Sequence, residues 1–310
     1  MILVSGEALI DLIPVADVDG RYDAVRGGSP YNVAMGLARL GAPTAFVSRI
    51  SADANGEALA AGLAADGVDL SLVERDRHPT TLAFVMRGTA QTGSRYSFYL
   101  DATSFDGEWP FPKVWPAKAR HLHVGSISAV DPRHGERVVA ALAQAKGALT
   151  TSFDPNLRPL VTPDRASVAA LVERQVALAS VAKASEEDLE WLYPGRPIED
   201  SLKVWAKLGP RFCVATLGAK GVVAYLDGER LAAAAAKVTV VDTVGAGDSF
   251  MSALLAAMDR DGALGAGAPA PNLERLAAWL AFAAAAAAFT CTRKGSDPPT
   301  RRDMTALGFA

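Results

Sequence analysis

The sequence predicts an α/β fold in which a mainly parallel sheet carries helices on both faces. Strand-like and helix-like segments alternate along most of the 310 residues, and glycines end several of the helical segments. Apolar residues recur at helical spacing between short apolar runs, which is the pattern of βαβ units. Half of the residues are apolar and 21% are charged, as in an ordinary globular protein.

The alternation can be followed from the N-terminus. Strands are expected at residues 2–4, 44–50, 121–126, 149–153, 181–184, 212–216, 222–226 and 238–241. Helices are expected at residues 30–40, 56–65, 132–146, 166–178, 246–260 and 274–290. Repeated alternation of this kind favours parallel pairing with both faces of the sheet covered.

Two stretches break the alternation. Residues 12–25 and 72–100 contain extended segments and turn residues without helical spacing. We expect a small β lid of antiparallel strands, formed from about residues 12–26 and 72–101; the alternative is loops on the main domain. The chain is long for one domain and short for two, so residues 1–310 are expected to form a single domain with this lid.

Composition also limits the partners. A net charge of −3 creates no basic field, so nucleic acid is not expected. The N-terminus has no signal-peptide pattern, and the longest apolar stretch, residues 276–290, is short for a bilayer. We therefore expect a cytoplasmic protein that does not bind membranes.

Cys213 and Cys291 lie in apolar runs and are predicted to be buried, reduced thiols. His121 and His123 share an expected strand with no third ligand in view, which favours a structural role.

The segment Asp-Thr-Val-Gly-Ala-Gly-Asp-Ser-Phe, at residues 242–250, lies between an expected buried strand and an expected helix. Such a turn presents backbone N–H groups at the positive end of a helix dipole and can bind an anion. Gly245 and Gly247 would let a phosphate approach the backbone. A carboxylate beside a phosphate is costly unless it takes a proton from an attacking hydroxyl, so Asp248 is the candidate general base. The alternative is that Asp242 or Asp248 only caps the helix.

A second segment, at residues 27–41, begins Gly-Gly-Ser-Pro-Tyr-Asn. The glycine pair precedes an expected helix start, where backbone amides and Asn32 could bond hydroxyl groups of a polar ligand. By itself the segment also fits a plain capped helix. The chain contains no Walker A sequence and no protein-kinase motif pair.

Together, these two segments resemble the two signatures of the ribokinase/fructokinase (PfkB-type) carbohydrate kinases. The similarity extends to residues 6–11, 152–159, 183–188 and 216–221, and it covers essentially the whole chain in the expected order. Gly-Glu-Ala-Leu-Ile-Asp and Phe-Asp-Pro-Asn-Leu-Arg-Pro are most similar to the fructokinase branch.

The resemblance implies a ribokinase-like fold and transfer of phosphate from Mg-ATP to a primary hydroxyl of a sugar, with fructose to fructose 6-phosphate as the leading reaction. It implies that Asp248 is the base and that the anion hole is formed by Gly245, Ala246 and Gly247. The implied sugar contacts are Asp11, Gly27, Gly28, Asn32 and Arg158. The implied nucleotide contacts are Lys183, Ser185, Thr216, Gly218 and Gly221. The resemblance also suggests K⁺ near residue 242 and a homodimer formed through the lid.

The chain departs from the family pattern at two places. Residues 185–188, Ser-Glu-Glu-Asp, replace the frequent Asn-x-x-Glu, so Asp188 would position Mg²⁺ through water. Ala284 stands where relatives often carry Asn near the adenine.

Several interpretations remain open. The acceptor could be 2-keto-3-deoxygluconate or another small molecule such as a nucleoside, with Arg95 and Arg158 as partners for an acid. A catalytically silent, kinase-like regulatory protein should have lost Gly245, Gly247 or Asp248. Smaller roles also stay open: Asp154 and Asn156 as turn formers, Phe98 and Tyr99 as lid packing or sugar contacts, and residues 293–295 as a helix end or a nucleotide contact.

Overall fold

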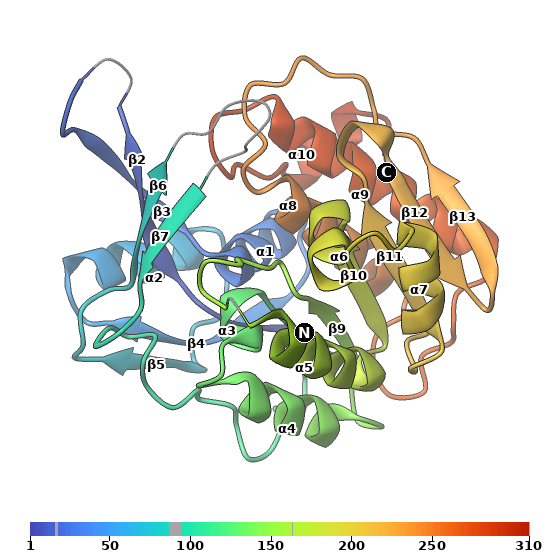
Figure 1. Ribbon diagram of the computed structural model, residues 1–310, viewed down its shortest axis with the longest axis horizontal. Helices are drawn as coiled ribbons and strands as arrows, with labels where there is room; N and C mark the ends of the chain where they lie inside the picture. The colour runs from blue at the N-terminus through green and yellow to red at the C-terminus, as the bar shows by residue number, and fades with distance from the viewer. Residues whose placement is uncertain (16–17, 87–94, 163, 310) are drawn as a thin grey trace.

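The computed structural model describes residues 1–15, 18–86, 95–162 and 164–309. Its main sheet has the strand order β13-β12-β11-β10-β9-β8-β1-β4-β5 (Figure 1). The strands are β1 (Ile2–Ser5), β4 (Thr44–Ser51), β5 (Val73–Asp76), β8 (His121–Gly125), β9 (Thr150–Asp154), β10 (Val181–Ser185), β11 (Phe212–Thr216), β12 (Val222–Leu226) and β13 (Glu229–Ala233). Among the described strands of this sheet, β12 alone runs opposite to the others, so the expected mainly parallel sheet is present.

Helices cover both faces of this sheet. One core contains residues of α1 (Ser29–Arg39), α2 (Ala54–Ala65), α8 (Ala246–Arg260) and α9 (Leu273–Cys291). The opposite core contains residues of α4 (Gly135–Ala145), α5 (Arg165–Leu178), α6 (Glu186–Leu192) and α7 (Ile198–Ala206). Three shorter elements complete the described helices: α3 (Ser126–Val130), the 3₁₀ turn η1 (Gly218–Lys220) and α10 (Arg301–Ala306).

The two cores follow from the alternation of side chains along each strand. In β11, Phe212 and Val214 join the first core, whereas Cys213 and Ala215 join the second. Because successive side chains point to opposite faces, a strand covered on both sides is expected to be mainly apolar. This preference explains why the short apolar runs in the sequence predict buried strands.

A smaller sheet with the order β3-β2-β6-β7 forms the lid, seen at the left of Figure 1. Its strands are β2 (Leu9–Pro14), β3 (Tyr22–Gly27), β6 (Leu82–Met86) and β7 (Arg95–Tyr99). The sheet is mixed, because β2 and β6 pair in parallel. The expected lid limits are wrong in one respect. Val73–Asp76 pairs with β4 in the main sheet, since the register of a strand depends on a partner that its own sequence does not reveal.

The strand expected at residues 238–241 is also absent from the described chain. Val238, Val240 and Val241 are 38%, 58% and 62% exposed, and no ladder includes them. The segment is instead fixed where the Val241 N–H donates to the Cys291 carbonyl at 2.8 Å. A run of β-branched residues predicts extended backbone, but it does not say whether the side chains face a core or a cavity.

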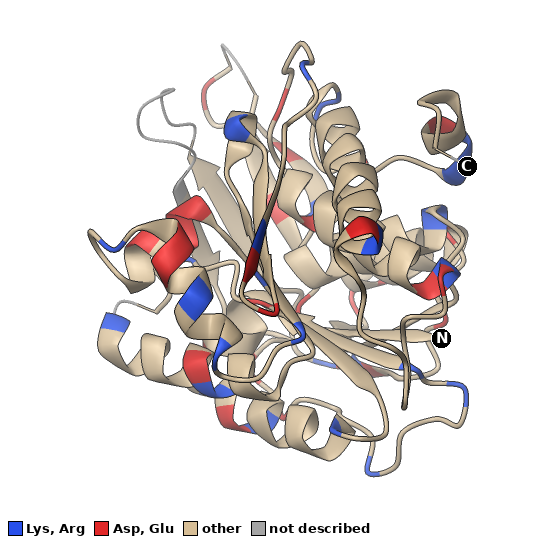
Figure 2. Cartoon of the chain, turned by 90° about the vertical axis from the view of Figure 1, so that its right-hand side faces the viewer, with Lys and Arg blue, Asp and Glu red and all other residues tan. Residues whose placement is uncertain are grey.

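By length and composition alone, α9 could cross a membrane. In the fold it packs against α8, β12 and β13, with Leu276, Trp279 and Leu280 buried. Such packing is that of a core helix in a globular protein. Charges of both signs are interspersed over the side of the molecule drawn in Figure 2.

We predict that the packing of α8 contributes strongly to stability. Leu254 is fully buried in α8. Leu254→Ala should lower the free energy of unfolding by about 3 kcal/mol, because the lost contacts leave a cavity. Leu307, which is 50% exposed, is the control, and Leu307→Ala should change stability by less than about 0.5 kcal/mol. Urea denaturation measures both values, and equal effects would contradict the packing described here.

Candidate functional site

A cavity of about 870 Å³ opens at the carboxyl ends of the parallel strands. Ser126, Asn156, Ser185 and Thr216 line it just after or at the ends of β8, β9, β10 and β11. In open α/β sheets this edge is where ligands bind. The starts of α1 and α8, the lid strands β2 and β7, the segment at residues 235–240 and helix α9 also line it, so the cavity joins segments from almost the whole chain.

Helix α8 begins at Ala246, with Gly245 at its N-cap in the left-handed conformation (φ 76°). A Cβ on Gly245 would lie 2.1 Å from the Ser296 Oγ, so only glycine fits. The Ala246 N–H donates to the Thr243 carbonyl at 3.3 Å. Within the described chain, the amides of Gly247 and Asp248 have no acceptor. Two open amides at a helix N-terminus form an anion site.

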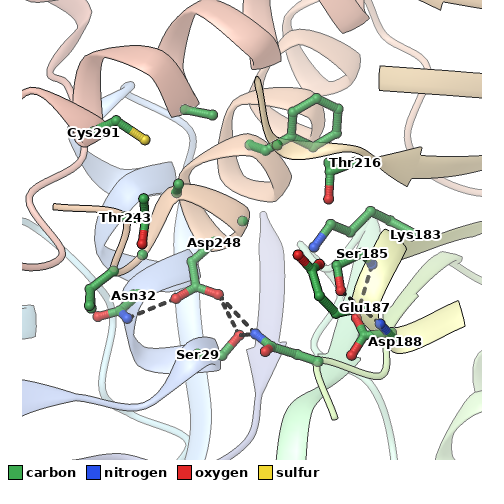
Figure 3. Close-up of a pocket in the computed structure, with 18 of the residues that line it drawn as sticks. Ser29, Asn32, Lys183, Ser185, Glu187, Asp188, Thr216, Thr243, Asp248 and Cys291 are labelled. Atoms are coloured by element: carbon green, nitrogen blue, oxygen red, sulfur yellow. Dashed lines mark hydrogen bonds between the residues drawn. The ribbon is translucent and has the colours of Figure 1, made fainter. Parts of the chain in front are cut away.

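The Asp248 carboxylate does not cap this helix. It accepts hydrogen bonds from the Ser29 Oγ at 2.6 Å, the Asn32 Nδ2 at 2.8 Å and the Asn156 Nδ2 at 3.2 Å (Figure 3). Burial raises the pKa of Asp248, while the donors Ser29 and Asn32 and the charge of Lys183 lower it in part. A buried carboxylate with a raised pKa at a cavity wall is suited to accept a proton.

A buried ion pair lies next to the anion site. The Lys183 Nζ donates to the Asp154 Oδ2 at 2.7 Å, and each side chain is 3% exposed. A Cβ on Gly247 would lie 3.2 Å from the Lys183 Nζ, which places the ammonium beside the first turn of α8. Burial lowers the pKa of Lys183, but the carboxylates of Asp154 and Asp188 more than offset it, so the amine stays protonated. Burial also raises the pKa of Asp154, to about 6.

The lid supplies a carboxylate at one end of the cavity. Asp11, on β2, lies against the backbone of Gly27, where a Cβ would be 2.1 Å from the Asp11 Oδ2. Burial raises the pKa of Asp11 to about 7; Arg158 lowers it, and the nearby Asp248 and Glu7 raise it further. Glu7 is itself 3% exposed, and burial raises its pKa. This end of the cavity therefore gathers buried carboxyl groups with raised pKa values.

Arg158 is bound to its own loop. Its Nη1 donates to the Asn156 Oδ1 at 2.6 Å and to the carbonyls of Asn156 and Leu157 at 3.1 and 2.9 Å. Its guanidinium lies 5.5 Å from the ring centre of Tyr96 on β7. Asn156 thus connects Arg158 to Asp248, and it adopts a left-handed backbone conformation (φ 38°) that is uncommon outside glycine.

At the end of β10, Asp188 and Ser185 form a capping box for α6. The Asp188 Oδ2 accepts the Ser185 N–H at 2.9 Å, and its Oδ1 accepts the Leu157 N–H at 2.8 Å. Asp188 lines the cavity together with the exposed Glu187 (Figure 3). Among the described residues, no group of three or more His, Cys, Asp or Glu side chains is placed to hold a metal by itself.

The cavity brings together the candidate residues from the sequence, with one exception. Gly27 lies behind Asp11 and does not line it. The remaining candidates all line it: Asp11, Gly28, Asn32, Arg158, Lys183, Ser185, Asp188, Thr216, Gly218, Gly221, Gly245, Ala246, Gly247 and Asp248. In the described residues, Asn32 Oδ1 is buried and has no hydrogen-bond partner.

The remaining expectations concern three lid residues and the two cysteines. Phe98 lines the cavity, whereas Tyr99 is 58% exposed and contacts Phe84 on the opposite face of the lid. The Arg95 side chain lies outside the described residues. Both cysteines are free, and Cys291 is only partly buried because it lines the cavity.

His121 and His123 are buried and share the Ser152 hydroxyl, each at 2.8 Å. Burial lowers the pKa of both imidazoles, that of His123 to about 3. This arrangement agrees with a structural role.

Sequence reasoning missed Ser29, Glu7, Tyr96 and the contact of Asn156 with Asp248. In the sequence, Ser29 indicates a helix start and Asn156 indicates a turn. The structure has both of these local features. The left-handed conformation of Asn156 leaves no mark that separates it from other Asn residues in turns.

The raised pKa of Asp11 predicts a pH-dependent stability. Because its pKa rises from 3.8 to about 7 on folding, the folded protein holds a proton that the unfolded chain has lost between those pH values. The contribution of Asp11 to stability therefore falls as the pH rises through this window. Asp11→Asn cannot ionise, so the variant should gain stability relative to wild type from about pH 4 to about pH 7 and level off above. Urea denaturation across this range measures the difference; a constant difference would contradict the burial of the carboxylate.

Comparison with known proteins identifies the family. The model of the pfkB family of carbohydrate kinases matches residues 1–302. A fructokinase of Rhizobium leguminosarum bv. trifolii is 36% identical over 270 residues, covering 85% of this chain and 81% of the relative.

Solved structures agree with this match. The fructokinase of Vibrio cholerae O395, with fructose, ADP and calcium bound, superimposes with a TM-score of 0.85 at 29% identity, covering 98% of this chain and 97% of the other. The fructokinase of Xylella fastidiosa with bound ATP gives 0.85 at 27% identity, covering 99% and 97%. The fold is thus ribokinase-like, and the chain belongs to the pfkB family of carbohydrate kinases.

Proposed function

We propose that this ATP-dependent sugar kinase phosphorylates fructose on a primary hydroxyl to give fructose 6-phosphate. The observation that carries the proposal is the position of the Asp248 carboxylate. It lies in the first turn of α8, beside the open amides of Gly247 and Asp248, and lines the same cavity as Asn32, which donates to it. A hydroxyl held there can lose its proton to the carboxylate as its oxygen attacks a phosphoryl group bound at the helix start.

The charge of the acceptor end favours a neutral sugar over a sugar acid. Asp11 and Glu7 line this end beside Asp248. Arg158, a cation at this end, is already bonded to two carbonyls and the Asn156 side chain. A carboxylate substrate such as 2-keto-3-deoxygluconate would meet acidic groups without a free partner, which is unfavourable in a partly desolvated site. The related Vibrio cholerae structure contains fructose, which supports the same choice.

The reaction follows from these positions. Asp248 takes the proton of the sugar hydroxyl, and the oxygen forms a bond to the γ-phosphorus while the bond to the bridging oxygen of ADP breaks. The amides of Gly247 and Asp248, together with the Lys183 ammonium, stabilise the negative charge on the transferred group. Thr216, Gly218 and Gly221 line the nucleotide side of the cavity. Tyr96 and Phe98 of the lid lie over the acceptor end, where they would exclude water.

The donor set at α6 fits Mg²⁺ carried by the nucleotide. Asp188 and Glu187 provide carboxylate oxygens at the cavity wall, and Mg²⁺ keeps several of its waters when bound. We infer that these residues hold the ion through water and that it neutralises charge on the phosphates. K⁺ would bind near Asp242. The carboxylate of Asp242 accepts the N–H of Val244, in the turn before α8, and the N–H of Gly295, in the segment after α9. A Vibrio cholerae fructokinase variant contains potassium, fructose and ADP.

Two further proposals concern the cellular location of the enzyme and its oligomeric state. A carbohydrate kinase that uses ATP is best placed in the cytoplasm. A homodimer through the lid would cover Tyr22, Met86 and Tyr99, which are about half exposed on the lid strands.

An acceptor panel tests the substrate. With Mg-ATP, we expect fructose to support ADP release with the highest kcat/KM among fructose, 2-keto-3-deoxygluconate, ribose and adenosine. A preference for the acid would overturn the charge argument. Absence of ADP release with every acceptor would favour a silent, kinase-like protein.

The role of Asp248 is tested by Asp248→Asn, which keeps the shape but cannot take a proton. Turnover with fructose should fall by roughly 10²–10⁴-fold, the usual contribution of a general base, while fructose still binds in a calorimetric titration. Asp200→Asn, on the exposed side of α7, is the control and should leave turnover unchanged. Near-native turnover of Asp248→Asn would remove Asp248 from the reaction.

Asn156 is proposed to position Asp248 and Arg158. Asn156→Ala removes the donor to Asp248 and Ser29 and the acceptor of Arg158, so kcat should fall by about tenfold or more with a smaller change in KM. Asn272→Ala removes the N-cap of α9 and serves as the matched control. It should cost about 1 kcal/mol of stability and leave kcat in place. Equal kcat values for the two variants would contradict the positioning role.

A further inference from the structure

The cavity has an apolar end, opposite the acceptor. We use "apolar end" for the lining residues Val222, Ala235, Ala236, Val238, Val240, Ala284, Ala287, Ala288 and Cys291. It differs sharply from the acceptor end, where Asp11, Asn32 and Asp248 are gathered. Between the two ends lie the start of α8 and Lys183, where the phosphates would bind.

Helix α9 provides one wall of the apolar end. Ala284, Ala287, Ala288 and Cys291 follow the i, i+3, i+4, i+7 spacing, which places them on one face of a helix. The Val241 N–H donates to the Cys291 carbonyl at 2.8 Å, so the segment at residues 234–240 reaches the end of this helix. Because β12 and β13 also pack on α9, the lining residues form a continuous surface rather than scattered contacts.

If the proposed function holds, this surface is where the base of the nucleotide lies. A donor nucleotide has phosphates, which belong at the α8 amides, and a flat base, which is the part with most apolar area. The acceptor end is polar and is used by the sugar, so the apolar end remains for the base. The exposure of Val238 and Val240, unfavourable in an empty site, is then relieved by the stacked ring.

The apolar end offers little that could distinguish one base from another. None of the residues that define the apolar end has a charged side chain, and the neighbouring Lys237, which also lines the cavity, is exposed. A flexible ammonium can approach acceptors that adenine and guanine share. The thiol of Cys291 is a weak donor. In the described chain, residues 235–240 take part in no backbone ladder, and an extended segment presents both N–H and C=O groups along its edge.

We propose that the donor site accepts purine nucleoside triphosphates in general, so that GTP and ITP serve as phosphoryl donors alongside ATP. Apolar contact discriminates between rings by their size but not by the hydrogen-bonding groups on their edges. Sites that reject an analogue by large factors do so because buried polar groups would be left unpaired, whereas apolar pockets discriminate by only about 10–200-fold. UTP and CTP carry a smaller ring that buries less area, so they should be weaker donors.

The test compares donors at saturating fructose. We expect kcat/KM for GTP and ITP within about tenfold of the value for ATP, and any ratio below about two-hundredfold supports the proposal. Discrimination above that limit overturns it, because it would require a group that reads the purine edge. If fructose is not phosphorylated with ATP, the proposed function has failed instead. Competition of GDP and ADP for the empty enzyme, measured by calorimetry, then decides the donor question by the same limit.

A matched pair of variants locates the effect. Ala284→Asn places an amide, which can bond both the N6 and N7 of adenine, on the face of α9 that lines the cavity. The ratio of kcat/KM for ATP over GTP should rise by at least about threefold. Ala281→Asn makes the same change on the exposed side of α9 and should leave the ratio as in wild type. Identical ratios for the two variants would overturn the placement of the base against α9.

Discussion

The site depends on the hydrogen bonds that hold the Asp248 carboxylate. Ser29 and Asn32 donate from the start of α1, and Asn156 donates from the loop after β9. These segments are far apart in the chain and meet only because a parallel sheet brings the carboxyl ends of its strands to one edge. A buried carboxylate without such donors would be costly to ionise. The arrangement of α1, β9 and α8 is therefore also the condition for the base that we propose.

A second constraint is electrostatic. The protein has a net charge of −3 and lines one cavity with Glu7, Asp11, Asp188 and Asp248, yet it must bind a polyanion. Long-range attraction cannot provide this binding. The positive potential is local instead, from the first amides of α8 and the ammonium of Lys183, whose position is fixed by Asp154. Burying Lys183 and Asp154 together costs desolvation, but it places one cation where we propose that the phosphoryl group is transferred.

The sequence predicts what depends on local periodicity and misses what depends on distant partners. Most strands of the main sheet and the helices α1, α8 and α9 follow from apolar spacing and helix-ending residues. The place of Val73–Asp76 in the main sheet does not, since its pairing with β4 is invisible in its own residues. Residues 238–241 read as a buried strand because composition reports extended backbone and not the surface that it faces. Asn156 is the same case in the site: its turn is predictable, but its contact with Asp248 arises from tertiary structure.

The two ends of the cavity are built from different parts of the fold. The acceptor end includes Asp11, Tyr96 and Phe98 from the lid, whereas the apolar end comes from β12, the segment after β13, and α9. Directional hydrogen bonds can reject a wrong acceptor strongly, and apolar contact cannot do the same for a base. No residue of the lid strands belongs to the apolar end. We infer that selectivity and exclusion of water are functions of the acceptor end, and that the donor end holds the phosphates in line.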